Sequence, residues 1–392
     1  MSYLEGVEGV EGVEGVEGVE GVEGVEGVGH FSRMPVSSLI AHREGIVGYW
    51  ADPTNWPYKT GWDSSELDPG AHGPLWRWDP RIRRFLFEFE LLSSLYFAFD
   101  TTYDANNVPL PRATLYSFQP TNVPSSTAAP VGTWSGFFSM TRPSEARLLK
   151  QLDLMNGYAD LRRDRAREIV AQMSPQFAFW GSVIPIYPAR HRYTLELIEM
   201  VLRLAKHAEM QFKNALCVRR PNEYSPQIQP IIQTPVHGSL PSGHSTEAHA
   251  VARVLYALVS KGAPPLDGGG LVKPELLLLR QQLKRQAARI AINRTVAGLH
   301  YPVDSMAGQA LGLAVGDYFI ARATVGGQVA AWTFDGAVYP ALQDFTGSEI
   351  YDEVTNGRQS SLPAYLVSDP TFTVNIAPGL NWLWGQATGE WP

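Results

Sequence analysis

The sequence contains a single cysteine, Cys217. One cysteine can form neither a disulfide within the chain nor a cysteine-based metal site. We expect Cys217 to serve as a small buried apolar residue. Long apolar runs are also missing, since none reaches the roughly 18 residues that a membrane-spanning helix needs. The N-terminus lacks the basic and apolar segments of a secretory signal, so we expect a cytoplasmic protein without a membrane span.

An excess of basic residues is absent too. The chain has 32 Lys and Arg against 39 Asp and Glu, which gives a net charge of −7. Proteins that bind nucleic acid usually present a basic face, so we expect no nucleic-acid partner. Apolar residues make up 44% and charged residues 18% of the chain, as in an ordinary soluble globular protein.

The sequence divides into a low-complexity start and a longer globular remainder. Residues 5–28 are eight tandem copies of Glu-Gly-Val, a repeat with eight like charges and no means of building a packed core. We predict that residues 1–30 form a disordered tail, the alternative being an arm that orders against a neighbouring subunit. Residues 31–392 are predicted to form one helical domain, built from two helical halves.

Apolar spacing predicts helices through most of this domain. They cover residues 81–99, 143–173, 190–212, 242–260, 274–293 and 302–323. Residues 104–143 are rich in Pro, Thr and Ser and are predicted to be mostly loop. The last sixty or so residues have no clear period and are predicted to be irregular.

Three short motifs in the middle of the chain carry the chemistry. In the first, Lys213 precedes Arg220 by two helical turns, and Pro221 disfavours helix at Arg220. We expect the arginine to lie at a helix end, from which it can turn toward a ligand. Arginine offers a planar fork to oxyanions and lysine a point charge. Taken alone, the pair is more typical of a solvated basic face.

The second motif is Pro-Ser-Gly-His at residues 241–244. Ser242 is placed as the N-cap of a helix, whose free N–H groups and dipole favour an anion. Gly243 lets the backbone approach a ligand closely, and His244 in the first turn can exchange a proton with a bound oxygen. An ordinary capped helix start explains this motif equally well when it is considered alone.

The third motif contains Arg294, His300 and Asp304. Pro302 suits the first position of a helix, which places Asp304 in the first turn. Asp304 either hydrogen-bonds one nitrogen of the His300 ring, leaving the other as ligand or nucleophile, or only complements the helix dipole. Together the three motifs supply three cations, a hydroxyl, a glycine amide, two histidines and a carboxylate, as a pocket for a tetrahedral oxyanion requires.

The triplet Lys-x6-Arg-Pro, Pro-Ser-Gly-His and Arg-x5-His-x3-Asp resembles the signature shared by vanadium-dependent haloperoxidases and type 2 phosphatidic-acid-type acid phosphatases. His237, seven residues before His244, resembles in place a second histidine of vanadium bromoperoxidases, whereas chloroperoxidases carry an aromatic residue there. Asn293 departs from the phosphatase pattern, which usually has Ser before the arginine. Met210 stands where haloperoxidases often have Trp or Arg, so details of a halide pocket do not carry over.

The resemblance implies an all-α fold of two four-helix-bundle-like halves with long loops and the active site between the bundles. It implies vanadate as cofactor, with His300 as the axial ligand of the vanadium. The vanadate oxygens are then held by Lys213, Arg220, Arg294, Ser242 and Gly243. His244 is then the acid–base group, Asp304 orients His300, and His237 is part of the catalytic set.

The implied reaction uses hydrogen peroxide to oxidise bromide or iodide to a hypohalite-level species, which halogenates a small organic acceptor. Members of this family are commonly homo-oligomers, and we expect the same here. Two alternatives stay open. One is a soluble acid phosphatase in which His300 attacks phosphorus. The other is a non-catalytic assembly protein that works through its Glu-Gly-Val arm.

Overall fold

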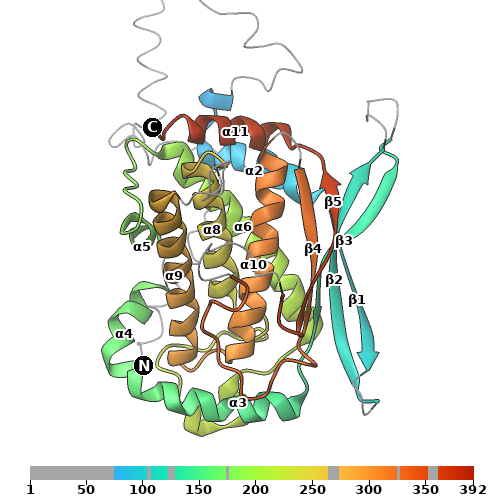
Figure 1. Ribbon diagram of the computed structural model, residues 1–392, viewed down its shortest axis with the longest axis vertical. Coiled ribbons are helices and arrows are strands. Elements are labelled where there is room, and N and C mark those ends of the chain that lie inside the picture. Colours follow the sequence, from blue (N-terminus) through green and yellow to red (C-terminus); the bar gives the residue numbers. More distant parts are fainter. Residues whose placement is uncertain are drawn as a thin grey trace, which may run out of the picture. The chain divides into compact units, whose positions relative to one another are not determined.

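A computed structural model of the protein describes residues 75–103, 107–121, 129–173, 176–263, 273–324, 327–351 and 361–392 (Figure 1). The Glu-Gly-Val tail predicted over residues 1–30 lies outside the described residues. The chain divides into two units, residues 1–83 and residues 84–392. Of the first unit, the described part contains the 3-10 turn η8 (Leu75–Arg77) and the start of helix α2 (Pro80–Leu92).

Four long helices form the core of the second unit: α6 (Arg192–Leu216), α8 (Gly243–Val259), α9 (Pro274–Val296) and α10 (Pro302–Ala323). They run side by side, with α8 in contact with each of the other three (Figure 1). The amphipathic spacing of α6 buries one face completely, including Leu197, Val201 and Phe212. α10 is buried along nearly its whole length, which explains its almost continuous apolar sequence.

Small residues let α8 and α10 approach closely. A Cβ atom added at Gly308 would come 2.7 Å from the carbonyl oxygen of Ser242, and one at Gly312 would come 2.3 Å from that of Thr246. Both positions therefore require glycine. This contact fixes the start of α8, which carries the Pro-Ser-Gly-His motif, against the first turns of α10, which carry Asp304.

Shorter helices complete the helical part. They are α3 (Glu145–Tyr158), η9 (Ala159–Leu161), α4 (Arg162–Ala171), α5 (Phe177–Gly181), α7 (Pro221–Tyr224), η10 (Pro226–Ile228) and α11 (Pro378–Thr388). α4 packs against α9 and brings its C-terminal end toward the functional motifs. No helix among the described residues has a stretch that is long and apolar enough to cross a membrane.

A five-stranded sheet lies beside α10 (Figure 1). Its strands are β1 (Leu95–Tyr103), β2 (Pro109–Pro120), β3 (Gly132–Thr141), β4 (Gly327–Asp335) and β5 (Leu366–Val374), in that order across the sheet. Neighbouring strands are antiparallel except β3 and β4, which are parallel. One face of the sheet packs on the helices: Phe97 and Phe138 both meet the ring of Phe212 on α6, at 5.1 and 5.7 Å between centroids.

The sheet shows that the predicted all-α fold is wrong, and with it the two four-helix-bundle-like halves with a site between them. The helix predicted over residues 81–99 ends at Leu92, and the chain continues as β1. Residues 104–143, predicted as loop, contain β2 and β3, and the last sixty or so residues contain β5 and α11. The helices predicted over 190–212, 242–260, 274–293 and 302–323 correspond to α6, α8, α9 and α10.

The expectation for Cys217 was also wrong, because this residue is exposed. It caps α6 in the left-handed region, at φ 45°. The left-handed cap turns the chain away from α6 toward Arg220.

Candidate functional site

The ends of the four core helices bring the three motifs together. Lys213 lies in the last turn of α6, and Arg220 is the N-cap of α7. Ser242 is the N-cap of α8. Arg294 lies in the last turn of α9, and His300 comes two residues before α10. All five side chains are at most 5% exposed.

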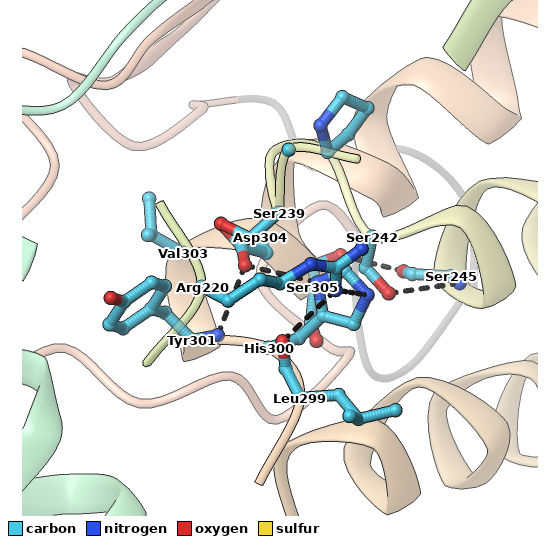
Figure 2. A network of polar contacts seen from close by, with 12 residues as sticks. Arg220, Ser239, Ser242, Ser245, Leu299, His300, Tyr301, Val303, Asp304 and Ser305 are labelled. Carbon is cyan, nitrogen blue, oxygen red and sulfur yellow. Dashed lines mark hydrogen bonds and ion pairs between the residues drawn. The ribbon is translucent and has the colours of Figure 1, made fainter. Parts of the chain in front are cut away.

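The ring of His300 is held from both sides (Figure 2). Its Nδ1 donates to Oδ2 of Asp304 across 3.0 Å, and its Nε2 accepts from Nη1 of Arg220, also across 3.0 Å. Asp304 Oδ2 accepts the backbone N–H of Tyr301 as well, at 3.1 Å. Of the two roles considered for Asp304, the geometry therefore includes the hydrogen bond to the imidazole.

The charge state of this pair follows from its burial. Burial and the nearby charges of Arg220 and Lys213 hold the pKa of His300 well below its usual range, so the ring is neutral. Burial raises the pKa of the Asp304 carboxyl to about 7, opposed by Lys213 and Arg220. A neutral ring that donates from Nδ1 has its lone pair on Nε2, the nitrogen that faces Arg220.

Lys213 and Arg220 also bind the loop before α8. Lys213 Nζ donates to the carbonyl oxygen of Pro241 and, more weakly, to those of Gly238 and Ser239 at 3.4 and 3.5 Å. Arg220 Nε donates to the carbonyl of His237 at 3.0 Å. Burial lowers the pKa of Lys213 to about 8, assisted by Arg220 and opposed by Glu209. The two cations thus position the loop and carry charge at the same time.

Arg294 differs from the other two cations. Its Nη2 donates to the carbonyl of Ile169 and to Oε1 of Gln172, both at 3.0 Å. Its Nε and Nη1 are buried and have no hydrogen-bond partner among the described residues. Burial lowers its pKa to about 10, so the guanidinium is still charged at neutral pH. Unsatisfied buried donors on a charged group are costly, which favours an anion as their partner.

The start of α8 provides further donors. Ser242 Oγ accepts the backbone N–H of Ser245 at 3.4 Å, as an N-cap does, and the hydroxyl hydrogen is left to donate elsewhere. A Cβ atom at Gly243 would come 2.6 Å from Oε1 of Glu209, so a larger residue at this position would have to displace the Glu209 carboxylate.

His244 is half-buried and donates from Nε2 to the carbonyl of Gln172 at 3.0 Å. Burial and the charge of Arg294 lower the pKa of His244 to about 3. The ring is therefore neutral beside the cations. A bound oxyanion would offset their charge and raise this pKa toward the range in which a histidine transfers protons.

His237 is half-buried at the edge of the same cluster. Its Nδ1 lies 3.1 Å from Nη2 of Arg220 and 3.2 Å from the carbonyl oxygen of Gly238. The structure therefore brings His237 into contact with a cation of the pocket. All nine residues predicted for the site lie at these helix ends or in the loops beside them.

Two residues of the site were not found from the sequence. Gln172, fully buried at the C-terminus of α4, accepts from Arg294 and Asn293 through its side chain and from His244 through its carbonyl. Glu209 is 4% exposed on α6, and burial together with Glu247 raises its pKa to about 8. Glu209 stands four residues before Lys213, which places both on one helix face and is the only sequence signal for it.

The donor set fits an oxyanion better than a bare metal ion. No group of three or more His, Cys, Asp or Glu side chains suited to a metal occurs in the part of the chain that the structure describes. Three buried cations and the two unpaired donors of Arg294 instead require negative charge. A tetrahedral oxyanion, including vanadate, meets that requirement.

Comparison with known proteins gives two findings. Residues 197–324 match the PAP2 superfamily, and this segment contains all three motifs. A solved structure described as the first transmembrane PAP2 type phosphatidylglycerolphosphate phosphatase from Bacillus subtilis is similar over 44% of this chain and 81% of that chain, with 18% identity and a TM-score of 0.27. No curated protein matches the chain.

Proposed function

We propose that this PAP2-domain site binds vanadate and that the protein is a haloperoxidase, which uses hydrogen peroxide to oxidise bromide or iodide. The observation that carries the proposal is Arg294, a buried guanidinium with two donors that have no partner among the described residues. An oxyanion supplies both acceptors and the missing negative charge. Members of the PAP2 superfamily are usually phosphatases or related enzymes, which bind oxyanions, and this agrees with the donor set.

Each side chain has a role that follows from its contacts. His300 would bind vanadium through Nε2, because Nδ1 is committed to Asp304. Lys213, Arg220 and Arg294 would neutralise the oxyanion, and the Ser242 hydroxyl and the Gly243 amide would donate to its oxygens. Vanadate so bound would act as a Lewis acid that polarises the peroxide.

His244 would act as the general acid and base. As a neutral ring, it can accept a proton from the incoming peroxide and return it to a leaving oxygen. The carbonyl of Gln172 holds its Nε2–H, which leaves Nδ1 as the nitrogen that accepts. Water exclusion strengthens these electrostatic interactions, because the cations are nearly inaccessible to solvent.

The halide preference rests on His237. Its ring lies against the Arg220 guanidinium at the half-buried edge of the cluster, where a large, weakly hydrated anion can approach. An imidazole donor beside an arginine suits bromide or iodide, and the oxidised halogen then reaches a small organic acceptor. We further propose that the protein assembles as a homo-oligomer.

A second function, an acid phosphatase, is favoured by the PAP2 superfamily match and by the orientation of His300. With Nδ1 bound to Asp304, Nε2 carries the lone pair that would attack phosphorus once Arg220 turns from it to the phosphoryl oxygens, and the same three cations suit a phosphoryl group. The leaving oxygen would take its proton from His244. This reaction needs no cofactor.

One pair of assays separates the two functions. The protein is reconstituted with vanadate and tested for halogenation of monochlorodimedone with peroxide and each halide, and the untreated protein is tested on a phosphomonoester. Vanadate-dependent bromination that His300→Ala abolishes supports the haloperoxidase. Phosphomonoester hydrolysis that vanadate inhibits, without any halogenation, supports the phosphatase. Halogenation that does not depend on added vanadate would refute the first proposal.

A further inference from the structure

A network of polar side chains connects the surface of α4 and α9 to the pocket. Its outer members are Arg289, which is exposed on α9, and Glu168, which is half-buried in the last turn of α4. Its inner members are Gln172, Asn293 and Arg294, and each of them is at most 1% exposed. Arg294 is thus the only member of the network that is also one of the three cations of the motifs.

The carboxylate of Glu168 accepts hydrogen bonds from three side chains. Arg289 donates from Nη2 to Oε2 across 2.6 Å and from Nε to Oε1 across 2.9 Å. Asn293 Nδ2 and Gln172 Nε2 both donate to Oε1, at 2.8 and 3.2 Å. The hydrogen bond from Arg289 is the main cause that lowers the pKa of Glu168, and burial opposes it. Glu168 is therefore ionised at neutral pH and can only accept hydrogen bonds.

These contacts allow one orientation of the Gln172 amide. Because its Nε2 donates to Glu168, its Oε1 is left to accept from Asn293 Nδ2 and from Arg294 Nη2, both at 3.0 Å. Asn293 is fixed in the same way, since its Nδ2 donates to Glu168 and Gln172 and its Oδ1 accepts from Arg165 at 3.1 Å. In the reversed amide, the NH₂ group of Gln172 would face the guanidinium of Arg294, and two donors would meet.

Arg294 depends on this orientation because the network holds it at one nitrogen. Its Nη2 donates to Gln172 Oε1 and to the carbonyl of Ile169, whereas Nε and Nη1 have no partner among the described residues. The guanidinium is a rigid plane, so a fixed acceptor at Nη2 also sets the direction of the other two nitrogens. Those are the donors that an oxyanion would meet.

We propose that Glu168 is a positioning residue of the oxyanion site, whose carboxylate fixes the Gln172 amide and through it orients Arg294 toward the anion. The inference rests on the proposed function only in that the pocket must bind an oxyanion. Glu168 contacts Gln172 and Asn293, and these two lie between it and Arg294. A donor that is held in its bound orientation beforehand loses less conformational freedom when the anion binds.

Removing the carboxylate separates this role from a simple effect of charge. Burial lowers the pKa of Arg294, and the negative charge of Glu168 opposes that lowering. If only charge mattered, loss of Glu168 would make the pocket more positive and would tighten anion binding. If Glu168 positions Arg294, its loss weakens anion binding. The two explanations predict opposite signs.

Glu168→Ala is the test, with vanadate and, separately, inorganic phosphate titrated into the full chain by calorimetry. We expect both anions to bind about tenfold more weakly, as when an ion site loses a group that orients its ligands. The melting temperature should fall only slightly, because the ion pair with Arg289 is partly exposed and water can replace the carboxylate. Unchanged or tighter binding of both anions would overturn the proposal.

Three control variants isolate the carboxylate of Glu168. Asp164→Ala removes an exposed carboxylate one turn earlier on α4. Arg289→Gln removes the surface cation and leaves Glu168 in place, and Arg285→Gln removes an exposed arginine one turn earlier on α9. All three should bind vanadate within about twofold of the unaltered protein, because exposed charges contribute little. A tenfold loss in Asp164→Ala as well would show a general effect of charge and refute the positioning role.

A double variant shows whether Glu168 acts through Arg294. In the Arg294→Gln background, Glu168→Ala should weaken binding by less than about twofold, because the group that it positions is gone. A full tenfold loss in that background would overturn the inference. If phosphate binding shows these effects but no halogenation is found, the haloperoxidase proposal is wrong and the positioning role stands. If neither anion binds the unaltered protein, both are refuted.

Discussion

The guanidinium of Arg220 donates to Nε2 of His300 across 3.0 Å. The nitrogen that would bind vanadium or attack phosphorus therefore already has a hydrogen-bond partner (Figure 2). On the proposed function, an oxyanion that pairs with Arg220 would draw this donor away and leave the lone pair of Nε2 available, so that anion binding would itself expose the reactive nitrogen.

Asp304→Asn tests the orientation of His300. Asparagine can donate to Nδ1 and so favours the tautomer with the proton on Nε2, which has no lone pair to offer. We expect the catalysed rate to fall about 10- to 100-fold, as happens when a metal-binding histidine loses the group that hydrogen-bonds its other ring nitrogen. Steady-state kinetics measure this, with binding of the oxyanion followed separately. Unchanged rates would show that Asp304 only caps α10.

Arg294→Gln removes the two donors that have no partner among the described residues. Charge-assisted hydrogen bonds contribute about 1.5–3 kcal/mol each, so we expect at least about tenfold weaker binding of vanadate. The fold should not suffer, because glutamine can still donate to Gln172 and an unsatisfied buried charge is lost. Calorimetric titration with vanadate and thermal unfolding give the two readouts, and Arg285→Gln serves as the matched control. Weaker folding with unchanged vanadate affinity would show a structural role for Arg294.

Gln172→Glu tests the residue that links Arg294, Asn293 and His244. The new carboxylate keeps the shape of the side chain and offers Arg294 an internal counter-ion. We expect vanadate affinity to fall by about tenfold or more, because the carboxylate competes with the oxyanion for the guanidinium. The melting temperature without vanadate should change little, because the new ion pair with Arg294 is offset by loss of the hydrogen bond from Gln172 Nε2 to Oε1 of Glu168 at 3.2 Å. Tighter vanadate binding in this variant would contradict the role assigned to Arg294.

His237→Ala tests the division between halide and oxyanion sites. Removing the ring takes away a contact to Arg220 at the half-buried edge of the cluster but leaves the other partners of Arg220 in place. We expect a change in the Michaelis constant for bromide of about tenfold, with a smaller change in vanadate affinity. His207→Ala, a surface histidine on α6, is the control. A loss of vanadate binding equal to that in Arg294→Gln would refute this division.

The helices that carry the motifs could be predicted from the sequence, but the sheet could not. α6, α8, α9 and α10 have long apolar periods and clear start signals, such as Ser242 before α8 and Pro302 at the start of α10. In contrast, β2 contains Pro109, Pro111 and Pro120, and proline normally argues against a strand that pairs on both sides. The strand forms because long-range pairing outweighs that local preference.

The site shows the same division between local and distant information. The motif residues could be predicted because each motif is a short segment of the chain next to a predicted helix end. Gln172 could not, because its three contacts come from α9 and α8, more than 70 residues away along the chain. Only the packing of α4 on α9 creates them. No period or motif in residues 162–171 indicates this role.

Glu209→Gln tests the buried carboxylate beside Gly243. The pKa of Glu209 is raised from its usual 4.5 to about 8, by burial and by Glu247. Its contribution to stability is therefore fully present below pH 4.5 and is lost as the pH rises through about 8. Glutamine stays neutral, so the variant should gain at least about 1 kcal/mol over the unaltered protein between these limits. Urea unfolding at several pH values measures the difference, with Glu199→Gln on the same helix as control. If the variant were equally destabilised at every pH, Glu209 would be an ionised partner of Lys213 instead.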